Sequence, residues 1–395
     1  MLIDTFLSII LRVALFGVGA WLVMRTLLSA IRTFVLPRAV YDTIARFLFR
    51  HTRNVFNFIL LRLPDYRARD ATMALYGPIS VLILVPAFLL ILQVGFTLMF
   101  YGVGAESLYA AFAMSGSSLF TLGFVSATNV VEFTLAFLEA ACGTMITATL
   151  IGYIPTIYSM FSKRELLVST LEAGAGSPPW AVTLIERSFR VRALTSLSNM
   201  WLKWADWFTE TEESHTSLGV LIFFRSQQPN RSWVTAAGAI LDAAALVRSS
   251  IDIPIDPQAD LMIRNGYLAL KYIAKPFGFQ YHPAPHFPQQ PISVTRAEYD
   301  AAYTYLQAIG VPMKPNIDQC WLDFAGWRVN YDAQLLDLCA VVMAPTAPWS
   351  ADRCQGRSRL TPVFKDVNQV QDSEVSADAN SEDSLPDSAL PSRVE

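Results

Sequence analysis

Small polar residues interrupt a long apolar stretch of this chain. Their types and position make them the strongest candidates in the sequence for a functional site. Residues 115–118 read Ser-Gly-Ser-Ser, and they follow a short run that is typical of a helix. Inside a bilayer, backbone that is not helical persists only where it is buried in protein or lines an aqueous cavity. The segment 109–125 is therefore predicted to be re-entrant, a half-helix followed by an extended turn.

The end of this segment reads Thr121-Leu122-Gly123-Phe124-Val125. It resembles the potassium-channel selectivity filter T-V-G-Y-G, and more closely the T-L-G-F-G variants of bacterial two-transmembrane channels. In that family, four such strands point backbone carbonyls at a common axis, where the oxygens replace the water shell of a cation. The resemblance implies that the Thr121–Phe124 carbonyls and the Thr121 hydroxyl bind K⁺ as the transported ion. It further implies a homotetramer and no cofactor.

Two positions depart from the family pattern. Gly123 matches the first glycine of the family pattern, a residue type that reaches positive φ at little cost. Val125 stands where the family has its second glycine, and a β-branched residue at positive φ is an outlier. Ser126 replaces the family's acidic residue. These departures leave a competing hypothesis open, a membrane-tethered scaffold or sensor whose pore does not conduct.

The apolar segment that follows carries further candidate site residues. Glu139 and Gly143 reproduce the E-x-x-x-G spacing seen in some of these channels. A carboxylate in a membrane is a functional candidate by default, so Glu139 is expected to brace the filter or to lie near the pore mouth. Gly143 is either a gating hinge or a close packing contact. Thr144 and Thr147 are expected to face a wet cavity, and Ser118 to support the filter.

The composition indicates a mixed chain of 395 residues, since 53% are hydrophobic and 16% are charged. Crossing a bilayer takes about 20 apolar residues in a helix. Segments 3–24, 75–101 and 130–161 meet this requirement, although Arg12 lies within the first and is expected to snorkel. The predicted fold class is an all-α membrane protein, with an N-terminal membrane helix before a potassium-channel-like pore domain of two membrane helices around a re-entrant helix.

Arginines are concentrated between residues 25 and 70, where there are nine and no lysine. The positive-inside rule places this connector in the cytoplasm, the filter loop outside and the remaining chain in the cytoplasm of a multi-pass cell-membrane protein. Beside membrane spans, arginines interleaved with aromatic residues favour a helix on anionic lipid headgroups over nucleic-acid binding. The four cysteines are widely spaced, as expected for reduced cytosolic thiols.

The chain divides into five predicted regions. Apolar residues recur at helical spacing from 166 to about 350, which predicts an all-helical cytosolic domain. The last residues are acidic and poor in large apolar side chains, which predicts disorder. The boundaries are 1–36 for the N-terminal membrane segment, 37–70 for the basic connector, 71–162 for the pore domain, 163–350 for the helical domain and 351–395 for the tail.

One polar cluster in the helical domain could be catalytic. Glu210, Glu212, Glu213 and His215 lie close together, with Asp206, Arg225 and Asp242 nearby in the sequence. Di-metal carboxylate bundles need the E-x-x-H spacing twice, and this chain has it once here. An ion-paired bundle is therefore favoured over an enzyme or a metal site. The domain is expected to regulate or assemble the pore through an unknown cytosolic ligand or protein.

Overall fold

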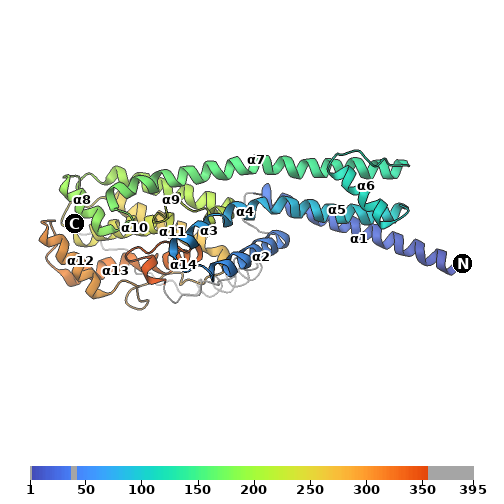
Figure 1. Cartoon of the computed structure of the whole chain (residues 1–395). Helices are drawn as coiled ribbons and strands as arrows, with labels where there is room; N and C mark the ends of the chain where they lie inside the picture. The colour runs from blue at the N-terminus through green and yellow to red at the C-terminus, as the bar shows by residue number, and fades with distance from the viewer. Residues whose placement is uncertain (1, 37–41, 355–395) are drawn as a thin grey trace, which may run out of the picture.

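The computed structural model describes residues 2–36 and 42–354, and every regular element in these residues is a helix. The helices form an elongated body (Figure 1). One end holds α1 (Leu2–Phe34), α5 (Leu84–Val103) and α6 (Leu108–Leu119), and is named the loop end. The other holds the helices that follow α7 and is named the domain end. The all-helical prediction is confirmed for the described residues.

Three helical stretches of the described chain are long and apolar enough to cross a membrane. They span Phe6–Phe34, Tyr66–Val103 and Val130–Ala175. Each continues beyond the predicted segment, because a helix does not end where its hydrophobic run ends. The prediction of three helices long and apolar enough to cross a membrane is therefore confirmed for the described residues.

The second stretch is divided into α3 (Tyr66–Ala74), α4 (Tyr76–Leu82) and α5. The breaks fall at Leu75 and Ile83, three residues before Pro78 and Pro86. A proline has no N–H to donate to the carbonyl four residues earlier, and its ring crowds that carbonyl. The breaks therefore fall where each proline removes a helical hydrogen bond.

Helix α1 packs against α5 through glycines. A Cβ atom at Gly19 would come within 2.4 Å of the Gly95 carbonyl oxygen. The Arg12 guanidinium lies 5.6 Å from the centroid of the Tyr101 ring, beside the last turn of α5. Arg12 therefore lies beside the loop end of α5. The first turns of α1 extend beyond α5 (Figure 1).

Helix α7 (Val130–Ala175) runs without interruption along the length of the molecule (Figure 1). Gly143, Gly152 and Pro155 all lie inside the continuous helix. Pro155 costs one backbone hydrogen bond, whereas the turns on both sides keep theirs. The same helix thus belongs to both ends of the molecule.

The basic connector contains α2 (Thr43–Leu60), capped by Asp42, while residues 37–41 lie outside the described part. Its inner face is buried, and Arg53 donates to the carbonyl of Val341 in the helical domain at 3.1 Å. The guanidinium also lies 5.2 Å from the ring centroid of Tyr76. The connector is thus joined to the helical domain, and is more than the membrane-surface helix that the sequence suggested.

The helical domain packs around one large hydrophobic cluster, which also includes Phe56, Leu60 and Tyr76 from the connector and α4. The last described turn, η3 (Ala351–Arg353), packs on this domain, so residues 351–354 belong to it. The remainder of the predicted disordered tail, residues 355–395, lies outside the described residues. The other elements are α8 (Ala181–Arg190), α9 (Ser198–Ser217), η1 (Gly219–Phe223), α10 (Trp233–Ser250), α11 (Pro257–Ala274), η2 (Lys275–Phe277), α12 (Arg296–Ala308), α13 (Ile317–Arg328) and α14 (Asp332–Val342).

Candidate functional site

The candidate site consists of α6 and the loop that joins it to α7. Ser107 caps α6, because its side chain accepts a hydrogen bond from the Ala110 N–H at 3.1 Å. Helix α6 packs between α5 and α7 (Figure 1). Ala111, Met114 and Ser115 face these helices and are buried. A short helix is therefore held between two membrane-length ones.

A buried polar contact joins the three helices at the middle of α6. The Ser115 hydroxyl lies 2.5 Å from Glu139 Oε1 on α7 and 3.1 Å from the Gln93 carbonyl oxygen on α5. Glu139 is fully buried. Glu139 therefore joins α7 to the middle of α6, on the inner side of the loop.

Gly143 lies one turn further along α7, where α6 ends. A Cβ atom there would come within 2.6 Å of the Leu119 carbonyl oxygen. A Cβ atom at Gly152 would meet nothing within 4 Å. Of the two roles left open for Gly143, the structure therefore favours close packing against the end of α6.

The loop after α6 folds around Ser117. The Ser117 carbonyl oxygen accepts from the Leu122 N–H at 2.8 Å, and its hydroxyl accepts from the Val125 N–H at 3.1 Å. Sequence reasoning assigned loop support to Ser118, but the Ser118 hydroxyl donates to the Met114 carbonyl within α6. No pattern in the sequence distinguishes these two serines, since both lie at the end of the same short helix.

The backbone has positive φ at Thr121 (53°) and at Gly123 (72°). Glycine adopts this conformation freely, whereas a threonine held there costs about 1–2 kcal/mol. Thr121, Leu122, Gly123 and Phe124 are exposed, and within the described residues their carbonyl oxygens accept no hydrogen bond. Val125 is half-buried against the neighbouring helices and does not have positive φ. Strained backbone of this kind recurs at functional sites.

The far end of the loop is anchored at the start of α7. Glu132 Oε2 accepts from the N–H and the hydroxyl of Thr128, at 2.7 and 2.8 Å. The Asn129 side chain caps α7 by accepting from the Glu132 N–H at 3.0 Å. Both ends of the loop are therefore fixed, while its middle projects from the chain.

The two threonines predicted to face a cavity lie on the exposed side of α7 in the single chain. Thr144 and Thr147 are both exposed. The Thr147 hydroxyl donates to the carbonyl of Gly143 at 2.9 Å, which leaves its oxygen able to accept a further hydrogen bond. Neither threonine contacts the loop directly.

A second polar site joins α7 to the helical domain. Arg164, almost fully buried, donates to the carbonyls of Leu221 at 3.0 Å and Phe224 at 2.6 Å. Its Nη1 also lies 3.1 Å from His215 Nε2. Because His215 Nδ1 lies 2.8 Å from the Thr211 carbonyl, Nδ1 carries the proton and Nε2 accepts from Arg164. Burial, followed by the charge of Arg164, holds the pKa of His215 well below its ordinary value.

The polar residues grouped from the sequence in the helical domain are separated in the structure. His215 bonds to Arg164, Asp242 pairs with Arg328, and Arg225 pairs with Asp70 at 3.0 Å. Glu210 and Glu213 line a separate cavity of about 140 Å³ between α7 and α9. Among the described residues, no group of three or more histidine, cysteine or acidic side chains is arranged to hold a metal.

No protein-family model, curated protein or solved structure matches this chain. The function is therefore inferred from the chain's own geometry.

Proposed function

We propose that this chain is one subunit of a homotetrameric cation channel that carries K⁺ passively and needs no cofactor. The observation behind this proposal is the arrangement of α6. It is a short helix held between two membrane-length helices by the buried contact of Ser115 with Glu139, and the exposed Thr121–Phe124 backbone follows it. Backbone carbonyls that accept no hydrogen bond within the described chain can replace the water shell of a cation.

A tetramer follows from the number of loops. Each chain contributes one such loop, and a filter of the potassium-channel type needs a ring of four. The side chains of Leu122 and Phe124 are 63% and 65% exposed in the single chain. Neighbouring copies would cover these apolar side chains and bring the four backbones to a common axis. Lipid would cover the outward faces of α1 and α5.

The conducting path would pass from the loop along α7. The carbonyl end of α6 carries partial negative charge, which favours a cation near Phe120. Thr144 and Thr147 lie on the exposed face of α7 below the loop and would line the cavity. Glu139 acts from behind the loop by holding α6 in place.

The proposed orientation places the loop outside the cell and the helical domain in the cytoplasm. The described arginines of the connector gather toward the domain end, whereas Glu106 and Glu132 flank the loop. Basic residues are retained on the cytoplasmic side. The domain then regulates or assembles the pore, with no enzymatic role, and an unidentified cytosolic ligand or protein acts on it.

A non-conducting scaffold or sensor is the second candidate, and the Val125 region favours it. Val125 packs against the neighbouring helices, and the loop turns back on Ser117 instead of continuing as an extended strand. A pore closed in this way could still transmit a signal to the helical domain through α7.

Potassium flux into liposomes that contain the purified chain separates the two candidates. The channel predicts flux that Gly123→Asp abolishes, because the carboxylate would lie in the ion path. Gly326→Asp adds the same group at an exposed position of α13 where a Cβ atom meets nothing within 4 Å, and should leave flux unchanged. A wild-type chain without flux under any condition, or a monomeric or trimeric state in detergent, would overturn the channel proposal.

A further inference from the structure

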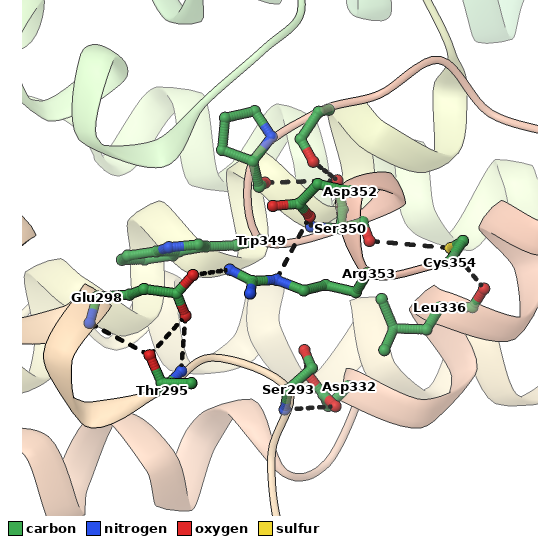
Figure 2. Close-up of polar contacts among 12 residues, drawn as sticks. Ser293, Thr295, Glu298, Asp332, Leu336, Trp349, Ser350, Asp352, Arg353 and Cys354 are labelled. Carbon is green, nitrogen blue, oxygen red and sulfur yellow. Dashed lines mark hydrogen bonds and ion pairs between the residues drawn. The ribbon is translucent and has the colours of Figure 1, made fainter. Parts of the chain in front are cut away.

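The last described turn of the chain is clamped onto the helical domain. Arg353 donates to Glu298 Oε1 at 2.6 Å (Figure 2). The Trp349 carbonyl accepts from the buried Arg328 at 2.6 Å. Within the turn, Asp352 accepts from the Ser350 N–H at 2.9 Å. These bonds fix the position of Cys354, which follows directly.

The Cys354 thiol is directed toward α14. It donates to the Leu336 carbonyl at 3.4 Å, one turn before Cys339 (Figure 2). Cys339 follows Leu336 by one turn on α14, so Cys354 lies next to the part of α14 that carries Cys339. The two cysteines come from different elements, α14 and the end of η3, and lie 15 positions apart in the sequence.

Both cysteines line one cavity of about 120 Å³, together with Tyr66 and Arg69 of the connector. One water molecule occupies about 30 Å³ of liquid, so a small oxidant fits into this space. Cys339 is 1% exposed, whereas Cys354 is half-buried and more accessible. The other two cysteines, Cys142 and Cys320, do not line this cavity.

We propose that Cys339 and Cys354 are a redox-modification site that forms a reversible intramolecular disulfide with a hydroperoxide as oxidant. The Cys354 thiolate attacks the peroxide, an S–O bond forms as the O–O bond breaks, and water leaves when the peroxide is H₂O₂. Cys339 then attacks the Cys354 sulfenic sulfur, an S–S bond forms, and a second water leaves. Two thiols lose two electrons and two protons in total, and one H₂O₂ becomes two waters.

The order of attack follows from accessibility. Burial raises the pKa of the Cys339 thiol well above its ordinary value, which makes it a poor first nucleophile. Cys354 reaches the cavity and solvent more readily, so it reacts first and Cys339 resolves the intermediate. Reducing compartments keep such pairs as thiols, and cytosolic disulfides that do form are usually transient and redox-sensing.

The disulfide would form next to the contact between the helical domain and the connector. The carbonyls at the end of α14 accept from Arg53 of α2, through Val341 at 3.1 Å, and from Arg225, through Val342 at 2.9 Å. Arg225 also pairs with Asp70 of α3. Closing a loop of about 15 residues should stabilise this junction and raise the midpoint of thermal unfolding by roughly 2–8 °C.

The test uses the full-length chain purified in detergent, treated either with H₂O₂ or with dithiothreitol. Thiols are alkylated in denaturant, disulfides are then reduced, and newly freed thiols receive a second label for peptide mass spectrometry. In the oxidised sample, Cys339 and Cys354 should both carry the second label, and the labelled fraction should be several-fold above that in the reduced sample. Cys142 and Cys320 should carry the first label in both samples, and dithiothreitol should reverse the shift in unfolding midpoint.

Variants complete the test. Cys354→Ser should leave Cys339 with the first label after peroxide and remove the midpoint shift, whereas Cys320→Ser, which alters another buried cysteine, should change neither result. If Cys354 oxidises only to sulfinic acid, pairs with a second chain, or keeps the first label, the proposal is wrong. The wild-type measurement decides the matter even if a variant fails to fold.

Discussion

Two fully buried charged residues, one at each end of the molecule, have very different surroundings. Arg328 in the helical domain donates to both oxygens of Asp242, at 2.5 and 2.6 Å, to Asp332 at 2.7 Å and to the Trp349 carbonyl. Glu139 in α7 accepts one hydrogen bond through Oε1, whereas Oε2 has no partner within the described chain. Both side chains are 0% exposed.

The contrast indicates how complete each end is as a single chain. A buried charge is tolerated when its partners satisfy it, and Arg328 has a full set in one subunit. An unsatisfied buried polar atom in a native structure needs an explanation, and Glu139 lies directly behind the loop that we propose binds ions. The Arg328 cluster is thus complete within one chain, whereas Glu139 at the loop end leaves one oxygen without a partner.

The largest loss of stability is expected from removing a partner of Arg328. Asp242→Ala removes the two shortest hydrogen bonds of Arg328 and leaves Asp332 as the only carboxylate paired with this buried charge, which should cost about 3–5 kcal/mol of stability. Asp318→Ala removes one of the two carboxylate partners of Arg296, near the surface of the same domain, and should leave the midpoint of thermal unfolding unchanged. Equal midpoints for the two variants would show that the Arg328 cluster does not hold the domain together.

The next effect concerns the contact between α6 and α7. Gly143→Ala places a methyl group 2.6 Å from the Leu119 carbonyl oxygen and should cost about 1–3 kcal/mol, because the helices must separate. Gly152→Ala on the same helix meets nothing within 4 Å and should gain about 1 kcal/mol from helix propensity. Thermal unfolding of the two variants compares them directly, and a stabilised Gly143→Ala would exclude the packing role.

A third comparison concerns Ser115, a buried serine of α6. Ser115→Ala removes the hydrogen bond to Glu139, so that neither carboxylate oxygen has a partner in the described chain, and should cost about 1–3 kcal/mol. Ser118→Ala removes only a bond within α6 and should cost less than about 0.5 kcal/mol. Potassium flux should fall with the first variant and persist with the second. The reverse order would make Ser118 the support of the loop.

The smallest effect is expected at the junction of the two ends. The pKa of His215 is depressed in the folded state, so below its unfolded value of about 6.5 the unfolded chain binds the extra proton. This contribution to stability is present at neutral pH and is lost as pH falls, by up to about 1.4 kcal/mol per pH unit. The difference between the midpoints of thermal unfolding at pH 7.5 and pH 5.5 should be smaller for His215→Gln than for the wild type. The exposed His51→Gln should retain the full difference.

Much of the fold could be predicted because hydrophobic length and helical spacing are local properties. The three membrane-length helices follow from their apolar runs, and the breaks before Pro78 and Pro86 follow from the missing proline N–H. The neighbours of Arg12 could not be predicted, because they depend on how α1 is aligned with α5, and that alignment is set by contacts such as Gly19 with Gly95. The sequence of α1 alone does not contain this information.

The candidate site was predicted in part for the same reason. Glu139 and Gly143 were singled out by their spacing, and both contact α6 in the structure. Ser115 and Ser117 were not distinguished from Ser118, since the choice depends on which side of a short helix faces its neighbours. Arg164, Arg53 and Arg328 were missed as buried partners because arginine is usually exposed and the groups they bind are distant in the sequence.

The continuity of α7 has a mechanical consequence. Its 46 residues form a rod about 69 Å long that is attached to the loop through Asn129 and Glu132 and to the domain through Arg164. A stiff rod acts as a lever arm, so a tilt of about 5° at one end displaces the other by about 6 Å. That displacement exceeds the diameter of a dehydrated cation, and a modest reorientation of the domain could therefore open or close a path at the far end.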